Sequence, residues 1–227
     1  VKWIDGPATE YNFTHGEKQD HTKHDYEKLL REPESAAWRD CEEADIPETE
    51  YFIADCPNDK VIRSIAPVKI GETEDCCIYD AGENISGTCV FTCSEKGKTV
   101  KITVSEEIDE NNQPHEKWVH GQTAEFICDG TEREYRLLFT WHAFRYFAIT
   151  KGAENVRCDV IHTALPVIAE FECENEVLNQ LFEMYIRTQL CNMHAGIPSD
   201  CPHIERRGYT GDGQLACEAA MLGIESR

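Results

Sequence analysis

The chain has 227 residues, of which 41% are apolar and 29% charged, so it can form one large domain or two smaller ones with a buried core. Its 43 acidic and 22 basic residues give a formal net charge of −21, which disfavours anionic partners such as nucleic acids and membrane surfaces. The chain has no apolar run of about 18 residues, so we expect no transmembrane helix.

Residues 1–60 are polar and poorly periodic, and we expect them to be the end of a preceding domain or a linker. Within them, the run from Tyr26 to Leu30 predicts a short helix that is ended by Pro33. The chain opens at Val1 with neither an initiator methionine nor a signal-peptide pattern. We therefore expect it to be the interior of a longer polypeptide, which leaves export open.

Residues 61–165 change to a period of two, which is typical of strands. The run Val100–Val104 alternates apolar and polar side chains, as a half-buried strand does. Further runs rich in strand-forming residues lie at 89–93, 124–127 and 136–140, with glycines and an Asn-Asn-Gln-Pro segment between runs. Short strands at this spacing predict an antiparallel β-sandwich domain.

The chain contains twelve cysteines, many of them in apolar surroundings such as 88–91 and 126–128. Such cysteines are typical of buried thiols that take the place of small hydrophobic residues. Disulfides would instead be expected in a small secreted chain. We therefore predict reduced cysteines and a cytoplasmic location, although the missing N-terminus does not exclude export.

Residues 166–227 change again, to a helical period. Asn175 can cap a helix that runs to about Met193 and carries an apolar face. A second helix is predicted from Gln214 to Leu222, after a loop from 196 to 213. Strands followed by helices indicate separate β and α domains rather than alternating βαβ units.

The predicted loop carries three acids, Asp200, Glu205 and Asp212, beside Tyr209. Glycosidases need such a set, because one protonated carboxyl donates to the leaving oxygen while other carboxylates bind hydroxyls and stabilise a cationic transition state. An aromatic ring can also stack on the apolar face of a sugar. The alternative is a surface loop whose acids are merely solvated, which a chain this acidic readily provides.

The order Asp-Cys-Pro followed by Glu-Arg-x-Gly-Tyr-x-Gly-Asp resembles the signature of the bacterial α-L-rhamnosidases, which are inverting glycoside hydrolases. The resemblance implies that Glu205 is the catalytic general acid. It implies that Asp200 and Asp212 bind rhamnose hydroxyls, and that Tyr209 lines the site where the family often has Trp. Asn192, before the motif, also fits the family pattern.

Two upstream stretches, 79–87 and 139–146, are similar to segments of the same family's β-sandwich domain. The family resemblance implies that residues 166–227 are the truncated N-terminal part of an (α/α)₆ catalytic barrel. It also implies a rhamnose-containing oligosaccharide or glycoside as substrate, with no cofactor or metal. In the second stretch we expect Trp141, His142 and Arg145 to pack a sheet edge rather than to form a site.

The sequence departs from the family pattern in two ways. Many members have Arg-Asp where this chain has only Ile204, so Asp200 and Glu205 are one residue closer and the sugar contact expected from that arginine is missing. The family's general base is a glutamate near the far end of the barrel. We therefore expect the base to lie outside this chain, and the chain alone to be inactive.

Three other functions are compatible with the residues. One is a non-catalytic carbohydrate-binding β-sandwich module, since the β region is complete enough to fold. Another is a zinc site made from two pairs of possible ligands, Cys191 with His194 and Cys201 with His203, although the spacing is unusual for zinc. The third is a nucleophilic thiol enzyme that uses Cys201 with His203.

Overall fold

The computed structural model describes residues 2–53 and 55–225, and most of its regular structure is β-sheet. The strands are β1 (Lys2–Trp3), β2 (Ala8–Asn12), β3 (Gly16–Asp20), β4 (Arg39–Asp40), β5 (Asp59–Ile65), β6 (Val68–Glu72), β7 (Cys76–Thr92), β8 (Thr99–Ser105), β9 (Thr123–Ile127), β10 (His142–Thr150), β11 (Glu154–Thr163), β12 (Met193–His194) and β13 (Ile197–Pro198). The helices are α1 (Tyr26–Arg31), α2 (Glu116–Val119), α3 (Glu176–Cys191) and α4 (Thr210–Gly223), with a 3₁₀ turn η1 (Pro33–Ser35).

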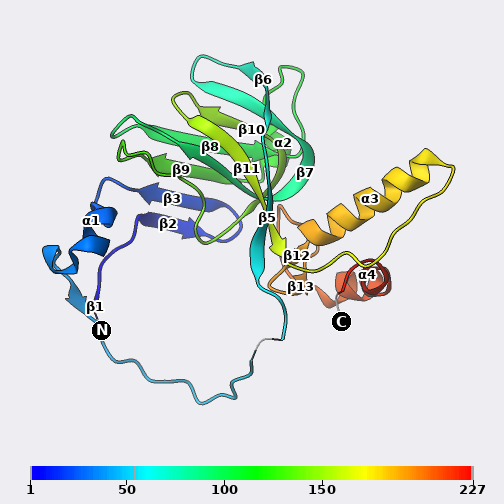
Figure 1. Ribbon diagram of the computed structural model, residues 1–227, viewed down its shortest axis with the longest axis horizontal. Helices are drawn as coiled ribbons and strands as arrows, with labels where there is room; N and C mark the ends of the chain where they lie inside the picture. The colour runs from blue at the N-terminus through cyan, green and yellow to red at the C-terminus, as the bar shows by residue number, and fades with distance from the viewer. Residues whose placement is uncertain (1, 54, 226–227) are drawn as a thin grey trace.

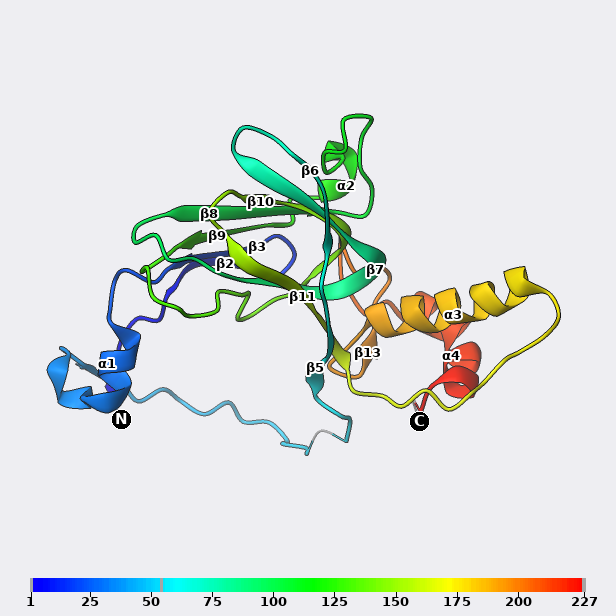
Figure 2. The same cartoon turned by 45° about the horizontal axis from the view of Figure 1, so that its top comes forward.

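The main sheet has nine strands in the order β2-β3-β9-β8-β10-β7-β11-β5, with β6 paired to β7. The long strand β7 bends and pairs with β10 and β11, and the sheet curls around one core (Figures 1 and 2). This architecture fits a β-sandwich-like domain. The predicted antiparallel sheet is wrong in one respect, because β3 runs parallel to β9. The sheet also includes β2 and β3, which precede the predicted limits of 61–165.

One apolar cluster fills the inside of the curled sheet. Val100, Ile102 and Val104 of β8 point into it and are at most 2% exposed, whereas Lys101 between them is exposed, as the alternation predicts. The buried members are Ala81, Ile85, Cys89, Phe91, Cys93, Val100, Ile102, Val104, Ala124, Phe126, Cys128, Tyr135, Leu137, Phe144, Phe147, Ile149, Cys158 and Val160. This cluster is the principal core of the molecule.

The run 136–140, which we predicted to be β-rich, forms no strand. Its amide groups bond to a side chain instead of a neighbouring strand. The carboxylate of Glu17, which is 2% exposed, accepts hydrogen bonds from the backbone N–H groups of Leu138 and Thr140, both at 3.0 Å, and from that of Phe139. A buried carboxylate satisfied by three amides fixes this segment as a turn.

The short N-terminal helix is confirmed as α1. Asp25 caps it, accepting from the amide of Lys28 at 2.9 Å, and the helix ends at Arg31 before Pro33 begins the 3₁₀ turn. Strands β1 and β4 pair with each other on either side of this helix. Residues 1–60 therefore contain regular structure, although most of it is small and exposed.

The C-terminal helices are also confirmed, with shifted boundaries. Asn175 caps α3, accepting from the amide of Val177 at 3.0 Å, and α3 ends at Cys191. Helix α4 begins at Thr210, four residues earlier than we predicted, so the loop is shorter. The two helices share a small second cluster with the buried residues Ile186, Met193, Ala220 and Ile224. Among the described residues, the helices all lack the length and apolar character needed to cross a bilayer.

Candidate active site

The predicted acids lie on the segment between β13 and the start of α4. Asp200 closes this segment on itself, because its amide donates to the carbonyl of Arg207 at 3.0 Å and its carboxylate Oδ1 accepts from the amide of Arg207 at 3.1 Å. The Cys201 thiol donates to the Oδ2 atom of Asp200 at 3.4 Å. Residues 200–207 thus form a closed loop, which we call the acidic loop.

Glu205 and Tyr209 contact each other on the outer side of the acidic loop. The Tyr209 hydroxyl donates a hydrogen bond to the Oε2 atom of Glu205, and both side chains are exposed. This hydrogen bond raises the pKa of the Tyr209 phenol. The structure therefore brings together the predicted acid and the predicted aromatic residue at a surface that solvent or a ligand can reach.

Asp212 lies on helix α4 rather than on the acidic loop. It is exposed in the first turn of α4, whereas we predicted that it lies on the loop before this helix. A carboxylate at this position is favoured by the positive end of the helix dipole. Within the described residues, no hydrogen bond or ion pair joins Asp212 to Asp200, Glu205 or Tyr209.

Arg206, unlike the exposed Glu205 before it, is buried, with 6% exposure. Its Nη1 atom donates to the carbonyl of Phe13 at 2.8 Å and to the hydroxyl of Thr140 at 3.0 Å, and its Nη2 atom donates to Oε1 of Gln122 at 2.8 Å. The ring of Trp141 lies 5.2 Å from the guanidinium carbon. Burial lowers the pKa of Arg206 to about 10. We call these four residues around Arg206 the arginine socket.

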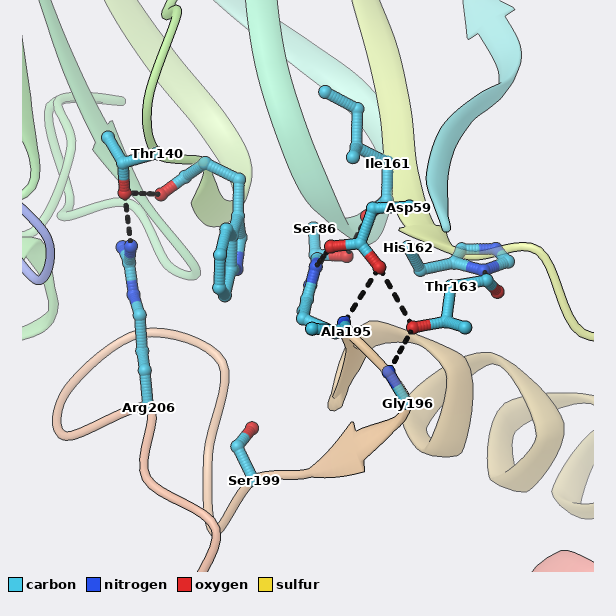
Figure 3. A network of polar contacts seen from close by, with 12 residues as sticks. Asp59, Ser86, Thr140, Ile161, His162, Thr163, Ala195, Gly196, Ser199 and Arg206 are labelled. Atoms are coloured by element: carbon cyan, nitrogen blue, oxygen red, sulfur yellow. Dashed lines mark hydrogen bonds and ion pairs between the residues drawn. The ribbon is translucent and has the colours of Figure 1, made fainter. Parts of the chain in front are cut away.

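A second contact joins the sheet to the segment just before the acidic loop (Figure 3). The Asp59 carboxylate of β5 accepts from the amide of Ala195 at 2.8 Å, from Nδ1 of His194 at 3.0 Å and from the Thr163 hydroxyl at 2.8 Å. The Thr163 hydroxyl in turn accepts from the amide of Gly196 at 3.0 Å. Burial alone raises the pKa of Asp59, but these hydrogen bonds outweigh it and lower the pKa below its usual value.

The three residues that we expected to pack a sheet edge contact different partners. Trp141 stacks on the ring of His194, with ring centroids 3.6 Å apart. His142 is 2% exposed and contacts the carbonyl of His15 through Nε2 at 3.1 Å. Arg145 forms two hydrogen bonds of 2.9 Å with Asp80. Trp141 therefore packs between the sheet and the segment that precedes the acidic loop.

The residues of the zinc hypothesis are each held by a different partner. The Cys191 thiol faces the carbonyl of Asn84, the His194 ring is held by Asp59, and His203 lies beside Glu106 with 3.5 Å between Nδ1 and Oε1. In residues 2–53 and 55–225, no group of three or more His, Cys, Asp or Glu side chains could hold a metal ion. Cys201 donates to Asp200 rather than to His203, which also disfavours the thiol nucleophile.

Three features of the site were missed from the sequence. We had assigned no role to Arg206, and neither Asp59 nor Gln122 attracted attention. The only local signal is the position of Arg206 directly after the predicted acid. The partners of Arg206 lie 66, 84 and 193 residues away along the chain, so no local pattern could have indicated them.

Comparison with protein families gives two adjacent matches. Residues 71–165 match the bacterial α-L-rhamnosidase concanavalin-like domain, and residues 166–226 match the bacterial α-L-rhamnosidase 6 hairpin glycosidase domain. An α-L-rhamnosidase of Formosa agariphila is 30% identical over 163 residues, which are 65% of this chain and 17% of that protein. An α-L-rhamnosidase of Streptomyces avermitilis is 27% identical over 193 residues, 80% of this chain and 18% of that protein.

Solved structures of similar proteins have the same arrangement of elements. The α-L-rhamnosidase from Dictyoglumus thermophilum superposes with a TM-score of 0.88 at 29% identity, covering 98% of this chain and 26% of that one. The Streptomyces avermitilis α-L-rhamnosidase complexed with L-rhamnose superposes with a TM-score of 0.83 at 24% identity, covering 98% of this chain and 23% of that one, and shows likeness of fold. The chain thus spans less than a fifth of the curated relatives and about a quarter of the solved ones.

Proposed function

Because this chain belongs to the bacterial α-L-rhamnosidase family, we propose that it is part of a glycoside hydrolase that releases terminal α-L-rhamnose by an inverting mechanism. The observation that carries the proposal is the exposed Glu205–Tyr209 pair on the acidic loop, at the junction of the sheet and the two helices. It supports a site built where two domains meet, with α3 and α4 as the first helices of an (α/α)₆ barrel.

Glu205 is the general acid in this proposal. Its carboxyl is exposed, so it can reach the leaving oxygen of a bound glycoside, and protonation of that oxygen is the task of one carboxyl in an inverting glycosidase. The Tyr209 hydroxyl donates to the carboxylate form of Glu205, and so stabilises the charge that remains once the proton has been transferred. The same aromatic ring forms one wall for the sugar.

Asp200 and Asp212 bind sugar hydroxyls in this proposal. The Oδ1 atom of Asp200 is occupied by the amide of Arg207 and Oδ2 by the Cys201 thiol, so the carboxylate is held in place and keeps acceptor capacity for a hydroxyl. Asp212 is exposed at the start of α4, on the element that follows Tyr209. The substrate would be a rhamnose-containing oligosaccharide or glycoside.

The mechanism also needs a general base, which activates the attacking water molecule. Inversion needs a second carboxylate about 6.5–9.5 Å from the acid, with a water molecule between them. We place this base outside the 227 residues and expect the chain alone to be inactive on an aryl α-L-rhamnoside. Hydrolysis by the isolated chain that is abolished by Glu205→Gln would show that the base lies within it.

The substitution Glu205→Gln in the full-length enzyme tests the acid. Glutamine cannot donate the proton, and general acid catalysis contributes about 10²–10⁴-fold, so turnover of alkyl rhamnosides should fall by about that factor. Aryl rhamnosides with activated leaving groups should lose much less, because their leaving oxygens need little protonation. Equal losses on both substrates would mean that Glu205 only positions the sugar.

The stereochemistry of the first-formed sugar tests the inverting mechanism. Proton NMR of the reaction of an aryl α-L-rhamnoside should detect β-L-rhamnose first, before mutarotation produces the α-anomer. Initial release of the α-anomer would contradict inversion without affecting the assignment of Glu205 as the acid.

A further inference from the structure

Arg206 is a buried cation whose hydrogen-bond acceptors are all neutral, and its Nε atom is buried without a hydrogen-bond partner among the described residues. Its hydrogen-bond acceptors are two uncharged side chains and one carbonyl, and the described residues place no carboxylate in an ion pair with it. Burial of a charge without a counterion is costly, and an apolar side chain could fill the same space. Stability alone therefore does not explain why an arginine occupies this buried position.

The backbone at Arg206 is also in an unfavourable conformation. Its φ is +54°, in the left-handed region that residues with a side chain adopt only at an energetic cost. At this turn the side chain of Arg206 is buried, while that of the preceding Glu205 is exposed. Figure 3 shows Arg206 extending from the loop to Thr140 in the sheet domain.

The arginine socket is held in place by hydrogen bonds that do not involve Arg206. Gln122 is fully buried, and its amide group bonds to both the N–H and the carbonyl of Ala143, at 2.8 and 3.3 Å. The Thr140 hydroxyl donates to the carbonyl of Phe13 at 2.7 Å. A planar guanidinium donates in fixed directions, so a rigid set of acceptors fixes its position and its orientation.

The socket is one of several contacts between the sheet domain and the acidic loop or the segment before it, and His203 of the loop also lies beside Glu106 and against the ring of His120. Asp59 and Thr163 hold the segment at Ala195 and Gly196, before the loop begins. Arg206 holds the far side, next to Glu205, and the paired backbones of Asp200 and Arg207 close the loop between them. Loss of Arg206 would remove the contact made by the residue next to the proposed acid.

We propose that Arg206 is a positioning residue, which anchors the acidic loop in the β-sheet domain so that the Glu205 carboxyl is aimed at the leaving oxygen. The inference rests on the proposed function of Glu205. The β-sheet domain then contributes to catalysis by fixing the position of the Glu205 carboxyl. A displacement of about 1 Å in a catalytic group can lower the rate by about 10²-fold.

The test uses the full-length enzyme with Arg206→Gln, Arg206→Lys and, as a matched control, Arg136→Gln. Arg136 has an exposed side chain in the turn that precedes Thr140, so the control removes the same charge without altering the socket. Turnover is measured on an alkyl and an activated aryl α-L-rhamnoside, with thermal unfolding of each variant. Thr140→Val is the substitute if Arg206→Gln does not fold; it removes one acceptor of Arg206 and the hydrogen bond from Thr140 to the Phe13 carbonyl, with little change in shape.

We expect Arg206→Gln to lower kcat on the alkyl rhamnoside by about 10- to 100-fold, and on the aryl rhamnoside by much less, because mispositioning weakens protonation of the leaving group. Arg206→Lys should recover part of the loss, Thr140→Val should show a smaller loss with the same selectivity, and Arg136→Gln should match the parent. Equal losses on both substrates, or a change in KM alone, would overturn the positioning role.

The Glu205→Gln variant separates this inference from the proposed function. If Glu205→Gln is selective for the alkyl rhamnoside and the Arg206 and Thr140 variants are not, only the role of Arg206 is wrong. If Glu205→Gln itself shows no selectivity, the proposed acid is wrong and the positioning role fails with it.

Discussion

His142 is a residue whose ionisation opposes folding. It lies in β10, 2% exposed, with its Nε2 atom 3.1 Å from the carbonyl of His15. Burial, with a smaller contribution from the positive charge of Arg206, lowers the pKa of His142 from 6.5 to about 3. The folded protein therefore keeps this ring neutral at pH values where the unfolded chain binds a proton.

This difference predicts a loss of stability in mild acid. Because the pKa is lower in the folded state, the contribution of His142 is complete above about pH 6.5 and falls as the pH decreases toward 3. Between pH 7.5 and pH 5 the free energy of unfolding should decrease by about 2 kcal/mol from this residue. Urea unfolding of the chain and of His142→Gln at both pH values measures it.

The variant should be less stable than the parent at pH 7.5 but should lose less stability on acidification. The comparison is needed because burial also lowers the pKa of His21 and His162, and both remain in the variant. Identical pH dependence in the two proteins would show that His142 is solvated or protonated in the folded state.

At the scale of elements, the apolar residues of the C-terminal helices are less well buried than those of the sheet. On helix α3, the side chains of Val177 and Leu181 are 70% and 56% exposed, although both belong to the apolar face predicted from the sequence. Helix α4 leaves Leu215 exposed at 89%. Most helical stability comes from packing an apolar face, so α3 and α4 are weakly supported in this chain. Further barrel helices, in our proposal, would cover these faces.

We therefore expect limited proteolysis to cut after about residue 165 before it cuts within the strands. A glutamate-specific protease suits the test, because Glu170, Glu172 and Glu174 are exposed in the irregular segment before α3. Hydrogen exchange should show the same order, with the amides of α3 exchanging before those of β8. First cuts inside β7 or β10 would contradict this ranking.

At the scale of the whole molecule, the burial and the thiol state of the cysteines are the features to consider. Five of the twelve are buried, Cys89, Cys93, Cys128, Cys158 and Cys191, and none is in a disulfide among the described residues. Burial raises the pKa of the Cys89 and Cys191 thiols, which keeps them protonated and unreactive. The buried cysteines thus act as small apolar residues of the core, as their sequence context predicts.

We propose a reducing compartment, consistent with a cytoplasmic location, and predict that thiol counting under denaturing conditions detects nearly all twelve cysteines. Without denaturant, the fast reaction should be confined to the exposed Cys41, Cys56 and Cys217. The count should be made on protein purified without reductant and repeated after reduction. Four or more disulfides would contradict the cytoplasmic assignment.

The sequence by itself determined the local elements and the family. Asn175 caps α3 and Val100–Val104 forms a strand because each signal arises within a few residues, where backbone and side chain interact directly. The acidic motif identified the family for a similar reason, since Asp200, Glu205 and Tyr209 are close in the chain and their order is distinctive. These properties do not depend on how distant segments meet.

Only the tertiary structure decided which distant groups complete these elements. Glu17 turns the β-rich run at 136–140 into a bend from more than 120 residues away, and the parallel pairing of β3 with β9 brings that carboxylate into the sheet. Arg206 gains its role from a socket assembled from three separate segments. Buried polar groups must find partners wherever the fold brings them, so the choice depends on the whole chain and not on the neighbouring residues.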